Sequence, residues 1–173
     1  MAQKVQFIVT VLHQPKLLIF DEPFSGFDPI NAQLIAKEIL QLRDEGATII
    51  FSTHRMESVE EMCDYIALIN KSNKILDGKL SDIKREFRTN TFQVGVQTAN
   101  PKEVENKLRE SFKVLPADFN LLNDGLKLNV KLTEGNSAND LLSFLTTQGQ
   151  VQHFVEVIPN ASDIFIQAIN KNS

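Results

Sequence analysis

The chain has 173 residues, of which 42% are hydrophobic and 23% charged, a composition typical of a folded globular protein with one ordinary domain or two small ones. Its net charge of −4 argues against nucleic acid as the main partner, and no apolar run approaches the roughly 20 residues that a membrane-spanning helix needs. A single cysteine, Cys63, excludes an internal disulfide and fits a reducing compartment, so the sequence favours a soluble cytoplasmic protein.

The first elements along the chain predict a strand, a helix and a second strand after an opening helix. The opening helix is predicted by apolar residues at helical spacing: Met1, Val5, Ile8, Val9 and Leu12. The unbroken apolar run Leu17–Phe20 predicts a parallel strand covered on both faces. Asp28 and Pro29 predict the start of a helix that Gly46 ends. Its buried stripe should consist of Ile30, Leu34, Ile35, Ile39 and Leu42. Residues 47–51 predict the second buried strand, reached by a right-handed crossover.

Polar side chains follow both predicted strands. Asp21 and Glu22 follow the first, and Ser52-Thr53-His54 follows the second. Because ligands of open α/β sheets bind beyond the carboxyl ends of parallel strands, Asp21 and Glu22 are placed where a ligand would bind, and the His54 imidazole can reach the same ligand as Asp21. Neighbouring strand residues point in opposite directions, so one carboxylate can hold a metal ion while the other handles a proton or a water. Taken singly, each motif has a plainer explanation, a solvated acidic turn or a structural histidine.

The segment Lys16–Pro29 resembles the Walker B strand, catalytic glutamate and D-loop of the ATP-binding cassette (ABC) ATPases, which have a P-loop NTPase fold. The family pattern is four apolar residues, Asp-Glu-Pro, and then Ser-Gly-Leu-Asp-Pro. Here it runs Leu17 to Pro23 and then Ser25-Gly26-Phe27-Asp28-Pro29, with Phe27 in the leucine place. The resemblance implies ATP and Mg²⁺ as cofactors: Asp21 would bind Mg²⁺ through water, and Glu22 would polarise the attacking water. It also implies that Ser25, Gly26 and Asp28 lie at a dimer interface.

His54 resembles the switch (H-loop) histidine of the same family. The implied role is to hydrogen-bond the γ-phosphate of ATP and help orient the water. Glu22 and His54 are therefore the expected catalytic residues, and Asp21 and His54 the expected contacts to the nucleotide and its metal. Met1-Ala2-Gln3-Lys4 resembles the end of a signature-motif variant, and no Gly-x-x-x-x-Gly-Lys-Ser/Thr occurs in the sequence. We therefore expect a C-terminal portion of an ATPase subunit that lacks the P-loop, the Q-loop and most of the signature motif.

The stretch from Met56 to Arg88 predicts a short helix, a hairpin and another short helix. The first helix should bury Met56, Val59, Met62 and Cys63, with a core role for the cysteine. The hairpin should pair Tyr65–Ile69 with Ile75–Gly78 around residues 71–74. The second helix carries Lys84, Arg85 and Arg88, which suit either a solvated face or contact with phospholipid or a membrane partner.

The pattern changes after residue 89, and we expect two domains, residues 1–89 and 90–173. Strands of the second domain alternate, as in Leu126, Leu128, Val130 and Leu132 against Lys127, Asn129 and Lys131. Asp124-Gly125 predicts a tight turn, and Ser137 with Asp140 a capping box. The order β-α-β-β-α-β plus a helix predicts a small ferredoxin-like α+β domain with one open sheet face carrying Lys127, Asn129 and Lys131. His153 is expected on a strand face, and no catalytic constellation is expected in this domain.

The resemblance implies an α/β ATP-binding and ATP-hydrolysing subunit of an ABC transporter. Its implied partners are a transmembrane permease subunit and a second ATP-binding subunit, and its implied place is the inner face of the cell membrane. Pro159, Asp163, Ile164 and Phe165 agree with a string that ends many bacterial ABC exporter subunits, which favours export. The chain by itself is a partial cassette, expected to be inactive alone. The alternative is a non-catalytic interaction or regulatory module that docks on a transporter or ATPase partner.

Overall fold

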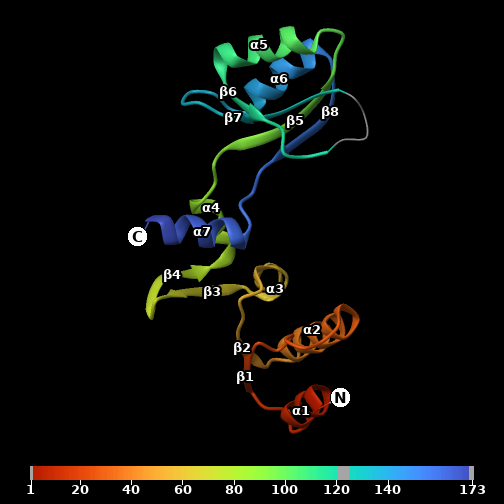
Figure 1. Cartoon of the computed structure of the whole chain (residues 1–173), viewed down its shortest axis with the longest axis vertical. Helices are drawn as coiled ribbons and strands as arrows, with labels where there is room; N and C mark the ends of the chain where they lie inside the picture. Colours follow the sequence, from red (N-terminus) through yellow and green to blue (C-terminus); the bar gives the residue numbers. More distant parts are fainter. Residues whose placement is uncertain (1, 121–124, 172–173) are drawn as a thin grey trace. The chain divides into compact units, whose positions relative to one another are not determined.

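The computed structural model of the chain describes residues 2–120 and 125–171 (Figure 1). The predictions for Met1 and Asp124 therefore lie outside the described residues. Within these residues, local sequence signals determine where the helices and strands begin and end. The chain forms two units, one from the residues up to Leu80 together with those from Phe165 onward, and one from Ser81–Ile164. The predicted division into domains 1–89 and 90–173, each of which would fold independently, stays a prediction.

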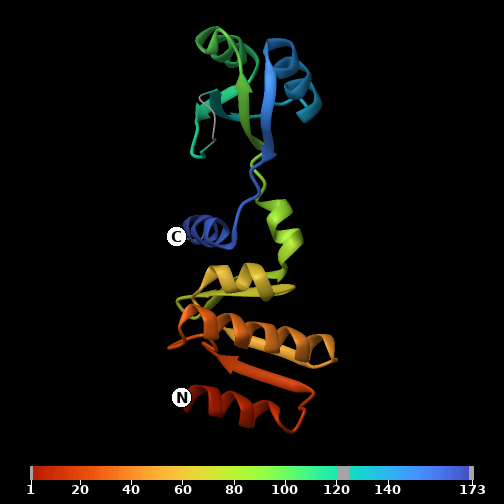
Figure 2. The same ribbon diagram turned by 90° about the vertical axis from the view of Figure 1, so that its right-hand side faces the viewer.

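The first unit begins with the predicted strand–helix–strand arrangement. Its elements are α1 (Ala2–Val11), β1 (Leu17–Asp21), α2 (Pro29–Asp44), β2 (Thr48–Ser52) and α3 (Met56–Met62). β1 and β2 pair in parallel, as expected, with Leu17 opposite Thr48 and Asp21 opposite Ser52. α2 runs alongside these strands (Figure 2). The two strands therefore end at the same level, which brings the residues after each strand together.

The ends of α2 confirm the predicted caps. Asp28 is the N-cap residue, and its carboxylate accepts the backbone N–H of Asn31 at 3.0 Å. Pro29 occupies the first helical turn, where its missing N–H costs nothing. Gly46 follows the helix with a φ of 104°, a left-handed conformation that glycine adopts without steric strain.

The core of the first unit covers only one face of the β1–β2 sheet. Its buried members are Phe24, Ile35, Ile39 and Met62, and Leu18 is also buried. The prediction of strands covered on both faces is wrong, because Leu17, Ile19 and Ile50 are 52%, 68% and 55% exposed. Along these strands alternate residues point to opposite faces, and among the described residues the second face has no covering layer.

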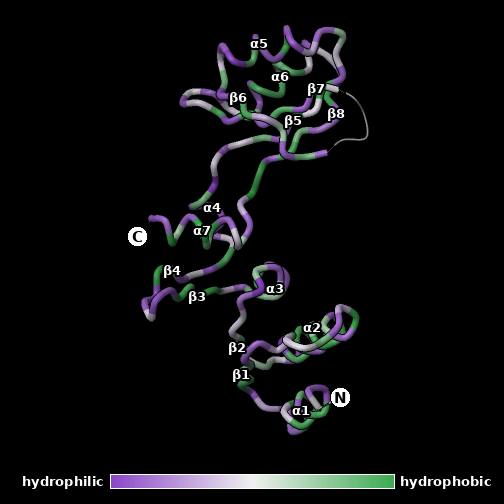
Figure 3. The backbone as a smooth tube through the Cα atoms, viewed as in Figure 1, coloured by the Kyte–Doolittle hydropathy of each residue, from purple (hydrophilic) through white to green (hydrophobic). Residues whose placement is uncertain are grey.

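Other apolar side chains of the first unit are also exposed. The apolar residues of α1, Val5, Ile8 and Val9, are exposed. Leu12, which follows the helix directly, is exposed as well. In α2, Ile35 and Ile39 are buried as predicted, whereas Ile30 and Leu34 are 79% and 50% exposed, so the predicted stripe is too wide. Figure 3 shows hydrophobic residues along α1 and near β1.

A hairpin of β3 (Tyr65–Asn70) and β4 (Asn73–Lys79) follows α3. Its loop is tighter than predicted, because Asn70 pairs with Asn73 and leaves only Lys71 and Ser72 between the strands. Both loop residues have positive φ, 47° and 63°, which matches the right-handed twist of a hairpin. α4 (Leu80–Glu86) starts directly after β4. Cys63, predicted in the core, is partly buried, and this burial raises the pKa of its thiol.

The second unit is a four-stranded antiparallel sheet with two helices on one face. Its elements are β5 (Thr91–Gln97), α5 (Pro101–Ser111), β6 (Lys113–Pro116), β7 (Leu126–Lys131), α6 (Ala138–Gln148) and β8 (Gln150–Glu156). The strand order is β6-β7-β5-β8, and every neighbouring pair is antiparallel. α5 and α6 pack on the same side of this sheet (Figure 1). The last helix is α7 (Ala161–Lys171).

The core of the second unit confirms the predicted contact between one sheet face and the two helices. Its buried members are Phe92, Val94, Val96, Val104, Leu108, Phe112, Val114, Leu128, Val130, Leu141 and Leu145. The alternation of β7 puts Leu128 and Val130 in this core. Ser137 forms the predicted capping box with Asp140 at the start of α6.

The sequence predicts that the opposite sheet face is open. The structure shows that its centre is covered. Asn129 is only 7% exposed, and its Nδ2 donates to Asp118 Oδ1 at 2.8 Å. Gln93 Nε2 donates to the same oxygen at 3.2 Å. Phe119 stacks on His153 of β8 with ring centroids 4.9 Å apart. The residues after β6 therefore cover part of this face, which makes the prediction of an exposed Asn129 wrong.

Candidate functional site

The carboxyl ends of β1 and β2 bring the predicted site residues together. Asp21 is the last residue of β1 and pairs with Ser52, the last residue of β2. The Ser52 hydroxyl donates a hydrogen bond to the Asp21 carboxylate. The pairing continues one step further, because the Glu22 backbone N–H donates to the Ser52 carbonyl at 3.0 Å. The two loops that leave the sheet are thus tied to each other where a ligand of a parallel sheet would bind.

Glu22 lies at the centre of this cluster in a constrained conformation. Its φ is 46°, in the left-handed region that few residues other than glycine occupy and that is common at functional sites. Its Oε1 accepts the backbone N–H of His54 at 2.9 Å and lies 2.7 Å from His54 Nδ1. Its Oε2 accepts the hydroxyl of Thr53 at 3.2 Å. Three groups of the neighbouring loop therefore fix this carboxylate.

These contacts favour the charged form of Glu22. The hydrogen bond with the His54 ring is the largest cause of a lowered pKa of the Glu22 carboxyl, and the His54 backbone and Thr53 act in the same direction. Glu22 is therefore ionised at neutral pH. Its side chain is 31% exposed and that of His54 is 83% exposed, so water and a ligand can reach both groups.

Ser25, Gly26 and Asp28, the residues predicted at a dimer interface, lie in the loop between β1 and α2. The Ser25 N–H donates to the Glu22 carbonyl at 3.0 Å, which starts a tight turn directly after the carboxylate. Gly26 has a φ of 75°, and a Cβ there would lie 2.8 Å from the side-chain amide of Gln3. Asp28 caps α2, and the Asn31 backbone N–H is the first cause of its lowered pKa. The interface role of these three residues stays a prediction.

The edge formed by Asp21, Glu22 and His54 suits a hydrated divalent cation with a phosphorylated ligand. Mg²⁺ prefers oxygen ligands and is commonly held by one or two carboxylates together with substrate phosphates. Asp21 supplies an exposed carboxylate at the strand end, oriented by the Ser52 hydroxyl. His54 supplies an exposed ring that can donate or accept a hydrogen bond. The residues present therefore fit the cofactors that the sequence motifs imply.

Sequence reasoning had assigned no role to Ser52 and Thr53. Ser52 orients Asp21, and Thr53 both donates to Glu22 and accepts the backbone N–H of Arg55 at 3.0 Å. Threonine hydroxyls often bond to nearby backbone groups, so the contact of Thr53 with Arg55 could have been predicted, whereas its contact with Glu22 depends on the strand register. The contact between Glu22 and His54 needs the strand register and could not be predicted from either motif alone.

Comparison with known proteins gives the family. The profile described as "ATP-binding protein DrrA1-3-like, C-terminal domain" matches residues 78–169. An uncharacterized ABC transporter ATP-binding protein of Alkalihalophilus pseudofirmus is 37% identical over 169 residues, which cover 96% of this chain and 59% of that protein. The uncharacterized ABC transporter ATP-binding protein YhaQ of Bacillus subtilis is 34% identical over 172 residues, which cover 96% of this chain and 53% of YhaQ.

A solved structure titled "Structure of ATP binding subunit of ABC transporter" is 33% identical and covers 49% of this chain and 35% of its own, with a TM-score of 0.46. This chain spans little more than half the length of the two relatives above. In the part of the chain that the structure describes, no helix is both long enough and apolar enough to cross a bilayer. With the profile match over residues 78–169 and these two relatives, the chain belongs to the ABC transporter ATP-binding proteins that have a DrrA1-3-like C-terminal domain.

Proposed function

We propose that this chain supplies the Walker B, D-loop and switch-histidine part of an ATPase subunit that drives an ABC transporter. The observation that supports this most is the hydrogen-bonded cluster at the paired ends of β1 and β2, where Glu22 contacts both Thr53 and His54 beside Asp21. A solvated acidic turn would not require a carboxylate fixed by three groups from the next strand end. The family to which the chain belongs is consistent with the use of ATP and Mg²⁺.

Each residue of the cluster has a distinct proposed role. Asp21 would hold the hydrated Mg²⁺, since its carboxylate ends the strand and is oriented by Ser52. Glu22, kept ionised by its hydrogen bonds, orients the attacking water and accepts its proton. His54 donates a hydrogen bond to a phosphate oxygen when its ring leaves Glu22. Mg-ATP, when bound, supplies the phosphoryl group and a cation that neutralises phosphate charge.

The contact between Glu22 and His54 has a consequence for this role. Glu22 Oε1 already accepts from the His54 backbone and lies within hydrogen-bonding distance of its ring. To orient a water, this oxygen needs a free lone pair in the direction of the water. The His54 ring is exposed and can rotate away, whereas the backbone N–H and Thr53 hold the carboxylate in place. Rotation of the His54 ring would thus free one lone pair, while the His54 backbone N–H and Thr53 keep the carboxylate in place.

The wider assignments belong to the same proposal. These residues act within a longer subunit, as in the relatives, with a transmembrane permease and a second ATP-binding subunit that the loop Ser25–Asp28 meets. The subunit lies on the inner face of the cell membrane, and the exporter-like residues from Pro159 to Phe165 favour export. The order β-α-β-β-α-β and the antiparallel order β6-β7-β5-β8 support a ferredoxin-like description of the second unit.

A second candidate function is a non-catalytic module that docks on a transporter or ATPase partner. The observation in its favour is the exposed apolar surface of the first unit, with the outward stripe of α1 and the open sheet face. Where exposed apolar residues form a large patch on a soluble protein, the patch marks an interaction site. The sequence has no P-loop. The docking role would therefore apply to these 173 residues alone, and ATP hydrolysis would require a subunit that also contains a P-loop.

The test compares two substitutions in the longer ATPase subunit that contains these residues. Glu22→Gln should reduce ATP turnover about 100-fold or more with nearly unchanged ATP binding, because the amide keeps the shape but cannot accept the proton. Asp21→Asn should instead raise the Mg²⁺ concentration needed for half-maximal turnover. Glu57→Gln, an exposed change on α3, is the matched control and should leave both quantities unchanged. Equal, mild losses in the two site variants would contradict these roles.

A further inference from the structure

The hydroxyl of Thr53 has a defined direction within the site. Its Oγ1 accepts the backbone N–H of Arg55 at 3.0 Å and lies 3.2 Å from Glu22 Oε2. A hydroxyl group has a single proton to donate, and the Arg55 N–H already brings a proton of its own to Oγ1. The Thr53 proton is therefore left to point at Glu22. Because Thr53 is β-branched and half-buried, its χ1 angle is restricted, which keeps this direction fixed.

The two carboxylate oxygens of Glu22 are occupied to different degrees. Oε1 accepts the His54 backbone N–H at 2.9 Å and lies 2.7 Å from His54 Nδ1, so both of its acceptor positions are used. Among the residues that the structure describes, only Thr53 donates a hydrogen bond to Oε2. Oε2 therefore keeps one lone pair open to a water even while the His54 ring contacts Oε1.

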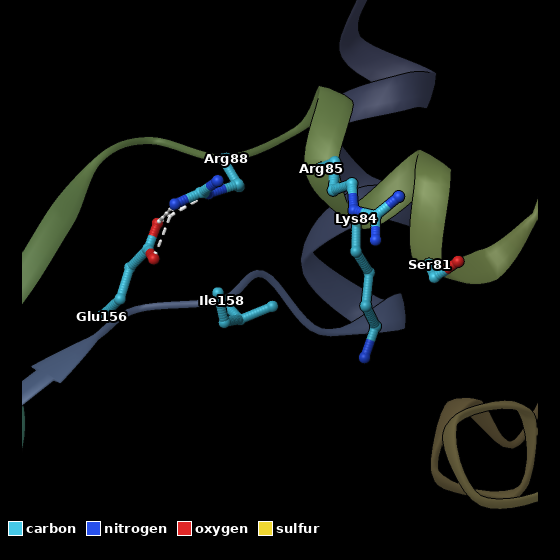
Figure 4. A pocket seen from close by; sticks show the side chains of 6 residues that line it. All are labelled: Ser81, Lys84, Arg85, Arg88, Glu156 and Ile158. Carbon is cyan, nitrogen blue, oxygen red and sulfur yellow. Dashed lines mark hydrogen bonds and ion pairs between the residues drawn. The ribbon is translucent and has the colours of Figure 1, made fainter.

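The donor to Oε2 carries no charge, which sets it apart from the cation that holds another carboxylate of the chain. Glu156 accepts Nε and Nη2 of Arg88, both at 2.7 Å, so a guanidinium pairs with both of its oxygens. Figure 4 shows this pair beside a pocket next to α4. A guanidinium in this position offsets the negative charge of the carboxylate. The Thr53 hydroxyl fixes Glu22 Oε2 without adding a positive charge, so the oxygen stays able to attract the proton of a water.

We propose that Thr53 is a positioning residue for Glu22, and that Oε2, the oxygen it holds, is the atom that takes the proton of the attacking water. The inference rests on the proposed function, in which Glu22 is the base. One proton passes from the water to Oε2 as the water oxygen forms its bond to the γ-phosphorus, and the bond from that phosphorus to the leaving ADP oxygen breaks. Thr53 does not touch the reacting atoms. It keeps Oε2 turned in one direction.

The first measurement is the pKa of Glu22 in the whole 173-residue chain, by carbon-13 NMR titration. Thr53→Val removes the hydroxyl and keeps the shape of the side chain. It should raise this pKa, because it removes a donor to the charged carboxylate. The His54 ring is the largest cause of the lowered pKa and Thr53 a smaller one, so the rise should be smaller than in His54→Ala. Thr53→Ser keeps the hydroxyl and should leave the pKa unchanged. Thr48→Val, the same change on an exposed residue at the other end of β2, is the matched control.

The second measurement is ATP turnover by the longer subunit that contains these residues. Thr53→Val should lower kcat about fivefold, the change expected for loss of one ordinary hydrogen bond. The KM for ATP should stay unchanged, because the contact acts on the water and not on nucleotide binding. Thr53→Ser should restore kcat, and Thr48→Val should leave both constants unchanged.

The outcomes separate this inference from the proposed function on which it rests. An unchanged Glu22 pKa in Thr53→Val would overturn the inference, since Thr53 would then serve only the local turn with Arg55. A kcat in Thr53→Val no lower than in Thr48→Val, while Glu22→Gln abolishes turnover, would overturn the inference and leave the proposed function standing. If Glu22→Gln itself turns over ATP normally, the proposed function fails and the role of Thr53 fails with it.

Discussion

Replacement of Leu108 by alanine tests whether the two helices and the sheet of the second unit form one tightly packed core. Leu108 lies on α5, has 0% exposure and belongs to the core cluster with Val94 and Leu141. The lost transfer free energy is about 2.4 kcal/mol, at ~0.8 kcal/mol for each buried methylene-sized group removed. Incomplete collapse of the cavity adds to this, so we expect a total loss of about 3–4 kcal/mol. A unit of this size has roughly 4–12 kcal/mol of stability in all.

Urea unfolding followed by circular dichroism measures this loss, with hydrogen exchange of α6 and β8 to assign the transition to the second unit. With a slope of about 1 kcal/mol per molar urea, the midpoint should fall by roughly 3 M. Leu12→Ala is the control, since it makes the same change at a residue that is 76% exposed, and it should cost less than about 0.5 kcal/mol. If Leu108→Ala costs less than about 1 kcal/mol, or no more than the control, the core is not packed as described.

Two further predictions concern a helix cap and the site carboxylate. Ser137→Ala should destabilise the second unit by about 1 kcal/mol, because it removes the acceptor of the hydrogen bond at the start of α6. Ser143→Ala, an exposed change within the same helix, should have no such effect in thermal unfolding. Carbon-13 NMR titration should give a lowered pKa for Glu22, and His54→Ala should raise this pKa toward its ordinary value. Because the pKa is lowered in the folded chain, the contribution of Glu22 to stability is present above its ordinary pKa and is lost as pH falls through the lowered one. An unchanged Glu22 pKa in His54→Ala would show that the ring contact is absent in solution.

The sequence predicted the placement of Asp21, Glu22 and His54 at neighbouring strand ends, because local signals and one topological rule determine it, whereas their roles stay predictions. Asp28 and Pro29 act within one helical turn, so the start of α2 could be predicted from neighbouring residues alone. The strand–helix–strand pattern then places the carboxyl ends of β1 and β2 together, which puts Glu22 and His54 at the same edge of the sheet. What the motifs could not show is that Thr53 fixes the carboxylate, since this depends on the register of the two strands.

The errors concern burial, which depends on segments far away in the sequence. An apolar run such as Leu17–Phe20 indicates a strand that can be buried on both faces. Whether both faces are buried depends on other segments of the chain, and the run itself carries no information about them. Ile19 is accordingly 68% exposed on the open face of β1. Asn129 shows the opposite error, because an alternating polar residue was expected in water. Asp118 on the segment after β6 reaches back to bind it.

The most direct test of the proposed function is whether Mn-ATP binds this chain, and beside which residues. Mn²⁺ can replace Mg²⁺ and broadens NMR signals of nearby residues, so it detects even weak binding. On addition of Mn-ATP, we expect broadening centred on Asp21, Glu22 and His54. Mg-ATP is the control, because Mg²⁺ is diamagnetic and should cause no such broadening. The signals of Leu141 and Leu145, buried in the core of the second unit, should stay sharp. Broadening centred on the acidic residues of α3, with sharp signals at Asp21 and Glu22, would contradict the proposed nucleotide site.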